Sequence, residues 1–272
     1  MSLHIYTDLV QGSEDWLAAR RGIVTASVVG QLVSTRRPSG LGYDCPECGA
    51  AGGEPCVSRA RRDAVPIKTL HATRVAPPDA PLVVEASAND TSRALTMTLV
   101  AERITGWTDP VYVSDDMLRG TMDEPIARDL YSRKYAPVTE VGFMVLEDDA
   151  GFQIGYSPDG LVGDDGLIEV KSRRPKKHLA TILANAVPIE NVAQIQCGLL
   201  VSGREWCDYV SFCGGMPLYV KRVYPDPDWH IAIKEAVHTF EQTAAQMVAD
   251  YATAVRGLPP TERIEHFAGI EF

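Results

Sequence analysis

Hydrophobic positions recur with the period of a helix in some segments and alternate with polar ones, as in a strand, in others. Together these patterns predict a mixed β-sheet with helices packed on it. A helix over residues 12–22 is predicted from its N-cap serine, its acidic first turn and its terminal glycine. A second helix is predicted to begin at Thr25 or Ser27. Two further helices, which flank the central sheet, are predicted over residues 95–104 and 122–131.

The second half of the chain predicts an antiparallel meander, then helices, two more strands and a long terminal helix. The predicted strands cover residues 138–146, 151–156, 161–162, 167–170, 206–213 and 218–223, and the predicted helices cover 178–186, 192–201 and 228–256. This order indicates an α/β (α+β) fold whose central mixed sheet is flanked by helices.

Residues 38–90 interrupt this pattern with prolines, glycines and three clustered cysteines, and they show little periodicity. We therefore interpret them as a module inserted into one domain that spans residues 1–272. The sequence has no internal repeat and no low-complexity tract.

Composition narrows the class of protein further. The 272 residues are 45% hydrophobic and carry 26 basic against 36 acidic side chains, a net charge of −10. This acidity argues against a protein that passively coats DNA, but it is compatible with a nuclease whose metal ions bring positive charge. No apolar run is long enough for a membrane helix and no leader pattern opens the chain, so a cytoplasmic protein with no membrane partner is expected.

The strongest chemical signal is the motif Pro158-Asp159, nine intervening residues, then Glu169-x-Lys171. Side chains two apart on a strand share a face, so a hairpin can bring Asp159, Glu169 and Lys171 together. Two carboxylates suit Mg²⁺, with Mn²⁺ as a substitute, and a neighbouring lysine can activate a water or neutralise phosphoryl charge. The alternative is an exposed hairpin with a surface Glu–Lys pair.

Four blocks in order resemble the lambda exonuclease family, the YqaJ-type viral recombinases, which has the restriction-endonuclease-like PD-(D/E)xK fold. The blocks are EDWLAARRGIVTAS, GTMDEPIARDLY, SPDGLV with GLIEVKS, and AQIQCGLLVSGREWCDYVSF.

The resemblance implies that Asp159, Glu169 and the backbone carbonyl of Val170 bind Mg²⁺ and that Lys171 is the catalytic lysine. It also implies Glu124 as an additional active-site acid, for which a charge near a helix start is the alternative. Of the two glutamines in the Q-x-Q pattern, Gln196 is preferred over Gln194 as the one facing the site. The alternative for Gln196 is a buried structural amide.

The resemblance further implies that Arg20 and Ser27 bind the terminal 5′ phosphate, which guanidinium geometry favours. A helix-end charge and a helix cap are the alternatives. Four basic residues follow closely after the predicted strand that carries Glu169 and Lys171: Arg173, Arg174, Lys176 and Lys177. They are predicted to contact DNA phosphates, with a solvated loop as the alternative.

The inserted module carries the spacing C-x2-C-x7-C-x14-H, formed by Cys45, Cys48, Cys56 and His71. Three thiolates and one imidazole satisfy a closed tetrahedral structural Zn²⁺ site, with free cysteines as the alternative. Nearby basic residues suggest nucleic-acid contact: Arg59, Arg61, Arg62, Lys68 and Arg74. The remaining cysteines, Cys197, Cys207 and Cys213, are predicted to lie in the core.

The resemblance implies a Mg²⁺-dependent 5′-to-3′ exonuclease that acts on double-stranded DNA ends in phage-type recombination. It would release 5′ mononucleotides, leave 3′ single-stranded tails, form a ring-shaped trimer and serve a single-strand annealing protein. The alternatives are an endonuclease or resolving nuclease of the same fold, and a zinc-dependent DNA-binding recombination accessory protein.

Overall fold

Two mixed β-sheets form the body of the protein, which a computed structural model describes over residues 1–58, 65–110 and 112–264. The first sheet has the order β1-β6-β7-β2, with β1 (Ser2–Tyr6), β6 (Phe143–Glu147), β7 (Gln153–Tyr156) and β2 (Val24–Thr25). The second has the order β11-β10-β9-β8-β5, with β11 (Tyr219–Val223), β10 (Trp206–Phe212), β9 (Gly166–Ser172), β8 (Gly160–Val162) and β5 (Val138–Thr139). The β2–β7 and β9–β10 pairs are parallel and the other neighbours are antiparallel, which confirms the predicted mixed α/β architecture.

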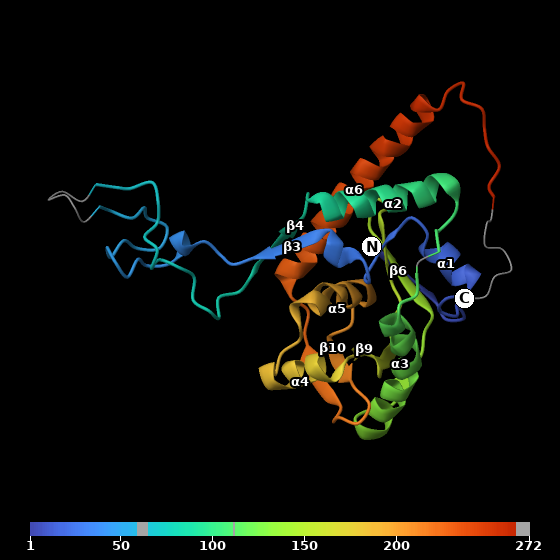
Figure 1. Ribbon diagram of the computed structural model, residues 1–272, viewed down its shortest axis with the longest axis horizontal. Helices are drawn as coiled ribbons and strands as arrows, with labels where there is room; N and C mark the ends of the chain where they lie inside the picture. Colours follow the sequence, from blue (N-terminus) through green and yellow to red (C-terminus); the bar gives the residue numbers. More distant parts are fainter. Residues whose placement is uncertain (59–64, 111, 265–272) are drawn as a thin grey trace.

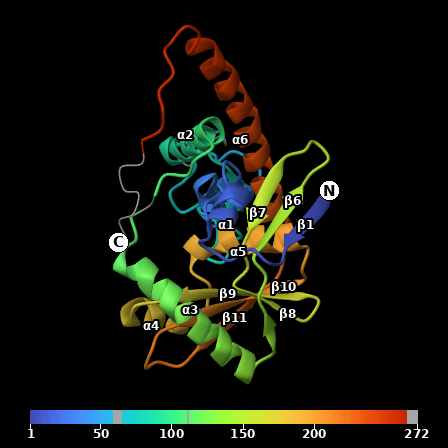
Figure 2. The same ribbon diagram turned by 90° about the vertical axis from the view of Figure 1, so that its right-hand side faces the viewer.

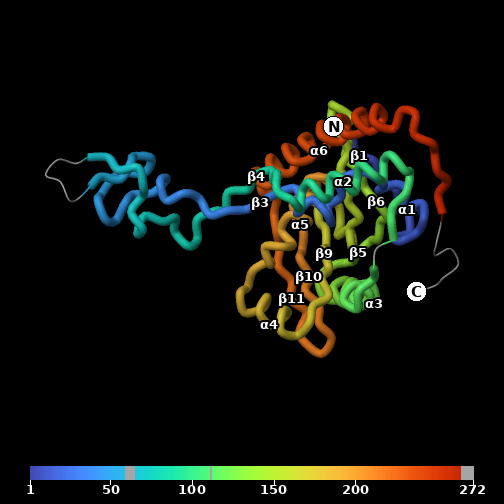
Figure 3. Tube along the Cα trace, turned by 45° about the horizontal axis from the view of Figure 1, so that its top comes forward, coloured from blue at the N-terminus to red at the C-terminus, as the bar shows by residue number. Residues whose placement is uncertain are grey.

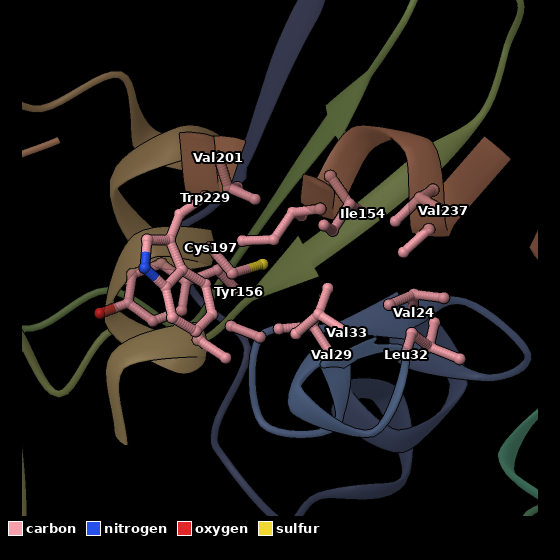
Figure 4. Close-up of a cluster of buried hydrophobic side chains, with 14 of the residues drawn as sticks. Val24, Val29, Leu32, Val33, Ile154, Tyr156, Cys197, Val201, Trp229 and Val237 are labelled. Carbon is pink, nitrogen blue, oxygen red and sulfur yellow. The ribbon is translucent and has the colours of Figure 1, made fainter. Parts of the chain in front are cut away.

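The main hydrophobic core lies where both sheets meet three helices: α2 (Asp90–Thr105), α5 (Ile189–Ser202) and α6 (Pro227–Ala254). In Figure 4, Ile154 and Tyr156 of β7 gather with Cys197 of α5 and Trp229 of α6. Cys207 and Cys213 are buried like Cys197, as predicted.

Three other helices complete the body. Figure 2 shows α3 (Asp115–Lys134) crossing one face of the five-stranded sheet, where its Ala127 and Tyr131 pack on β9 and β10. The short helix α1 (Glu14–Arg20) packs Trp16 against β6, and α4 (Pro175–Ala184) contacts β10. None of the described helices combines the length and the apolar character needed to cross a membrane.

The cysteine-rich segment leaves the body on a two-stranded stalk, visible in Figures 1 and 3. The stalk consists of β3 (Val33–Arg36) and β4 (Val83–Ala86), which pair antiparallel, and β4 contacts α6. We call residues 37–82 the arm module; its described part holds one short 3₁₀ turn, η2 (Gly40–Gly42), and an isolated bridge between Val57 and Pro66. Neither stalk strand was predicted.

The predicted first helix is confirmed, because the Ser13 side chain accepts a hydrogen bond of 3.2 Å from the backbone N–H of Trp16. The predicted second helix is wrong. Thr25 lies in β2, paired with β7, and only a 3₁₀ turn, η1 (Val29–Gln31), follows. Ser27 does not cap a helix, since its hydroxyl accepts from Arg20 instead.

The single strand predicted over 138–146 divides into β5 and β6, which belong to different sheets. Gly142 lies between the two strands, where a Cβ would stand 2.1 Å from the Leu9 carbonyl oxygen, so the chain passes too closely for any side chain. The predicted meander is therefore two antiparallel pairs, β6–β7 and β8–β9.

Gly198 of α5 gives a stability prediction, because a Cβ there would lie 2.7 Å from the Tyr156 ring. We expect Gly198→Ala to lower the free energy of unfolding, since overpacking costs about 1–3 kcal/mol, more than the helix gains from alanine, about 0.5–1 kcal/mol. Gly120→Ala in α3 is the matched control, because nothing lies within 4 Å of its added Cβ. Urea unfolding of both variants checks this; equal stabilisation of the two would contradict it.

Candidate functional site

The predicted motif residues meet at the join between β8 and β9. Asp159 directly precedes β8, and its Oδ2 accepts a 2.6 Å hydrogen bond from the backbone N–H of Val170 on β9. Glu169 is fully buried; its Oε1 lies 2.6 Å from Lys171 Nζ and its Oε2 lies 3.4 Å from the hydroxyl of Tyr156. Strand alternation therefore places Glu169 and Lys171 on one face, as the spacing predicts.

The carboxyl groups of Asp159 and Glu169 are buried close together, which disfavours a negative charge on both at once. Burial and the neighbouring Glu169 raise the pKa of Asp159 well above its ordinary value. Burial opposes the charged form of Lys171, yet Glu169 and Asp159 raise the pKa of this amine, so it stays protonated. The oxygen-only donor set suits a hard divalent cation, whose charge would relieve the buried carboxylates. The pair Asp159 and Glu169 thus fits Mg²⁺.

Glu124 reaches the same group from α3. Burial raises the pKa of the Glu124 carboxyl, Glu169 adds to the rise, and Arg128 opposes it through a hydrogen bond. Arg128 also pairs with Glu140, so its guanidinium is shared between Glu124 and Glu140. The structure therefore brings the predicted additional acid to the site.

A cleft of about 520 Å³ is lined by Glu124, Asp159 and Lys171 and also by Arg20 and Ser27, while Glu169 is buried next to Lys171. One guanidinium nitrogen, Arg20 Nη2, donates to the hydroxyls of Thr25, at 3.1 Å, and Ser27, at 3.0 Å. The cleft lining includes Arg20, Thr25, Ser27, Thr121, Glu124, Ser157, Asp159, Val170, Lys171 and Gln194.

Trp16 fixes Arg20 beside the motif. The Arg20 guanidinium carbon lies 4.1 Å from the centre of the Trp16 ring, and the indole N–H of Trp16 donates to the Ser157 hydroxyl at 2.9 Å. Burial lowers the pKa of Arg20 while Glu102 opposes that shift. Within the described residues no carboxylate oxygen lies within 4.0 Å of the Arg20 guanidinium, so the cleft holds a cation without a direct counterion.

The preference for Gln196 over Gln194 needs correction. Gln196 is buried, with its amide nitrogen donating to the Tyr224 carbonyl and its amide oxygen accepting from the Asp226 backbone N–H, both at 2.9 Å. Gln194 lines the cleft instead. Residues two apart on a helix point in different directions, and the packing of α5 turns Gln196 inward.

The basic run after β9 borders a second hollow of about 680 Å³, which shares Asp116, Met117 and Ser172 with the cleft. Three of the cations that line it have acidic partners: Arg119 with Asp116 at 2.6 Å, Arg174 with Asp116 at 2.7 Å and Lys177 with Glu190 at 2.6 Å. The predicted members that line it are Arg173, Arg174, Lys176 and Lys177. Arg119 of α3 lines it too; sequence analysis missed this residue, since a helical arginine carries no local signal.

The arm module brings the four predicted ligands together: their ligand atoms all lie within 4.8 Å of one another, in Cys45, Cys48, Cys56 and His71. Cys45 Sγ lies 3.4 Å from His71 Nδ1. Backbone N–H groups of Val57 and Ala50 lower the pKa of Cys48 to about 6, as a thiolate ligand needs. Arg59, Arg61 and Arg62 lie outside the described residues.

Arg74, predicted as a surface contact for nucleic acid, is instead the centre of the module and only 2% exposed. Its guanidinium donates to the Cys56 sulfur at 3.3 Å and to five carbonyl oxygens. These carbonyls belong to Gly40, Leu41, Tyr43, Ala51 and Glu54. A buried cation with every donor used supplements the small hydrophobic cluster of this module, which consists of Cys45, Ala50 and Cys56.

Comparisons with known proteins identify the family of the chain. Residues 69–205 match the family described as YqaJ-like viral recombinase domain. The chain belongs to this family. Residues 11–88 also match a family described as "Putative DNA-binding phage zinc finger domain", and this match covers the arm module.

Among solved structures, this YqaJ-like chain is similar to an alkaline exonuclease, LHK-Exo, from Laribacter hongkongensis. The two are 26% identical with a TM-score of 0.65, and the match covers 91% of this chain and 100% of that one. A structure of LHK-Exo in complex with dAMP matches with the same identity and coverage and a TM-score of 0.64. No curated protein matches significantly. The predicted family, fold and class of enzyme, a DNA exonuclease, are confirmed.

Proposed function

We propose that this YqaJ-like protein is a Mg²⁺-dependent exonuclease that degrades double-stranded DNA from 5′-phosphorylated ends. One observation carries the proposal: a single cleft is lined by Arg20, which has no direct carboxylate partner among the described residues, and by Asp159 and Lys171. Lys171 in turn pairs with the buried Glu169, which does not itself line the cleft. A guanidinium without a counterion suits a terminal phosphate, and the carboxylates with the lysine suit the next phosphate along the strand.

The residues divide the reaction between them. Asp159, Glu169 and the carbonyl of Val170 would hold Mg²⁺, which when bound supplies Lewis-acid charge at the scissile phosphate. Lys171, protonated beside Glu169, places a second positive charge where negative charge develops on the phosphoryl oxygens. Arg20, fixed by Trp16 and by two hydroxyls, orients the terminal phosphate.

Hydrolysis regenerates the feature that Arg20 recognises. Water adds to the phosphorus, the bond to the 3′ oxygen of the terminal nucleotide breaks, and the leaving oxygen takes a proton. The products are a 5′ mononucleotide and a strand whose new end carries a 5′ phosphate. The same cleft can therefore engage the shortened strand without any change of chemistry.

The second hollow supports a position for the rest of the substrate strand. It adjoins the cleft at Ser172 and Asp116, and four predicted DNA-contacting cations line it, so it suits the phosphates on the 3′ side of the cut. Their contribution to binding should weaken as salt rises, because each phosphate contact releases counterions.

Incubation with linear and closed circular duplexes, with and without Mg²⁺, tests this proposal. We expect Mg²⁺-dependent loss of the linear 5′-phosphorylated duplex while the circle stays intact. Cleavage of the circle would favour an endonuclease or resolving nuclease of the same fold. No cleavage of either DNA would leave a DNA-binding accessory role.

We also propose that the arm module, as a separate unit, binds one structural Zn²⁺ through Cys45, Cys48, Cys56 and His71, because these ligands are clustered and the match to the phage zinc-finger family covers them. The trimer and the single-strand annealing partner that the resemblance implies stay predictions. Sedimentation analysis with and without such a protein tests both.

Zinc removal gives a further prediction. We expect one zinc per chain, and we expect chelation to unfold the arm module while the body keeps its main thermal transition, because the described part of the module extends away from the body on the stalk. Elemental analysis and thermal denaturation measure the two quantities. Cys56→Ser should lose zinc and Cys213→Ala, outside the cluster, should retain it; loss of the main transition on chelation would reject an independent module.

A further inference from the structure

The arm module contains a polar chain that ends on one of the four clustered ligands. His71 Nδ1 faces Cys45 Sγ at 3.4 Å, so this nitrogen is the one turned toward the thiolates. The other ring nitrogen, Nε2, points away from the cluster and lies 3.6 Å from Glu47 Oε1. The second Glu47 oxygen accepts from the Thr73 hydroxyl at 3.3 Å.

In a neutral imidazole, one ring nitrogen carries the proton and the other has the lone pair that can bind a metal. A carboxylate beside Nε2 favours the tautomer with its proton on Nε2, which leaves the Nδ1 lone pair for the metal. The separation of 3.6 Å is slightly longer than a hydrogen bond, and the Glu47 side chain is partly exposed. The proposal requires this side chain to rotate slightly toward Nε2.

We propose that Glu47 is a positioning residue for the zinc centre: with Thr73 behind it, it fixes the Nε2–H tautomer of His71 and so presents Nδ1 to the metal. This inference rests on the zinc site proposed above and goes beyond it, since it assigns a role to a residue that is not a ligand. Outer partners of this kind typically contribute about 10–100-fold to metal affinity.

Position in the chain supports this role. Glu47 lies between Cys45 and Cys48, so the turn that sets the spacing of these two sulfurs also delivers the carboxylate to His71. His71 and Thr73 come from a later segment of the module, which follows residues 59–64, outside the described part of the chain. Glu47 thus connects two parts of the module that carry different ligands.

Competition for zinc against a chromophoric chelator, at one pH and with the full chain, tests the proposal. We expect Glu47→Ala to weaken zinc affinity by about 10–100-fold and Glu47→Gln to weaken it less, because the amide oxygen still accepts a hydrogen bond from Nε2–H. Glu54→Ala is the matched control: this acid lies in the same module and its side chain makes no hydrogen bond or ion pair with the described residues.

A second measurement does not depend on any variant. In ¹⁵N-labelled wild-type protein, the one histidine whose ring signals change on zinc removal should show zinc on Nδ1 and a proton on Nε2. Zinc on Nε2, or equal zinc affinities of Glu47→Ala and Glu54→Ala, would overturn the role of Glu47. Wild-type protein that binds no zinc would instead remove the proposed zinc site itself, so the two failures are distinguishable.

Discussion

Replacement of Lys171 by alanine is expected to lower the turnover of DNA hydrolysis by about 10²–10³-fold. The loss follows from the position of the amine, 2.6 Å from Glu169 Oε1, inside the cleft that also holds Asp159. Without it, the transition state loses a positive charge that Glu169 holds in position before the reaction begins. Binding of the duplex should change little, because the cations of the second hollow remain.

Lys234→Ala is the matched control for this substitution. Lys234 is an exposed lysine on α6 that does not line the cleft, so the same change of side chain and charge should leave turnover unchanged. Single-turnover rates at saturating protein separate hydrolysis from binding. If Lys171→Ala hydrolysed DNA at the wild-type rate, the assignment of the catalytic centre would be wrong.

Arg20→Ala is expected to remove the discrimination between 5′-phosphorylated and 5′-hydroxyl ends. Charge-assisted hydrogen bonds contribute about 1.5–3 kcal/mol each, which corresponds to about 10–100-fold in kcat/KM for the phosphorylated end. The variant should digest both ends at the slow rate that the wild type shows with 5′-hydroxyl DNA.

Ser27→Ala should give a smaller loss, because one of the two hydroxyls that hold the Arg20 guanidinium remains in Thr25. Arg93→Ala, an exposed arginine on α2, is the control for removing a guanidinium elsewhere. A preference for phosphorylated ends that survives in Arg20→Ala would move the terminal phosphate to another residue and leave the end-recognition mechanism without support.

The clustering of Asp159, Glu169 and Lys171 at the β8–β9 hairpin could be predicted from sequence because it depends on local rules. Alternation along β9 places Glu169 and Lys171 on one face, and the β8–β9 hairpin brings Asp159, just before β8, beside them. The same holds for the C-x2-C turn of the arm module, whose spacing alone brings two sulfurs together.

Other features depend on distant parts of the chain and were predicted wrongly. Thr25 joins a strand because β7 offers it a partner, which overrides a local pattern typical of a helix start. The orientation of Gln194 and Gln196 is set by how α5 packs near Asp226, about thirty positions later in the chain. Arg74 looked like a surface charge because sequence does not show the five carbonyls that surround it.

The order in which the two ends of one strand are released tests the central claim most directly. A linear duplex with blunt, 5′-phosphorylated ends would carry one fluorophore on the first and another on the last nucleotide of the same strand. With Mg²⁺ present, the account predicts that the label on the 5′ nucleotide is released first, as a mononucleotide, while the 3′ label stays on a long strand. Earlier release of the 3′ label, or labelled fragments from internal cuts, would contradict a 5′-to-3′ exonuclease.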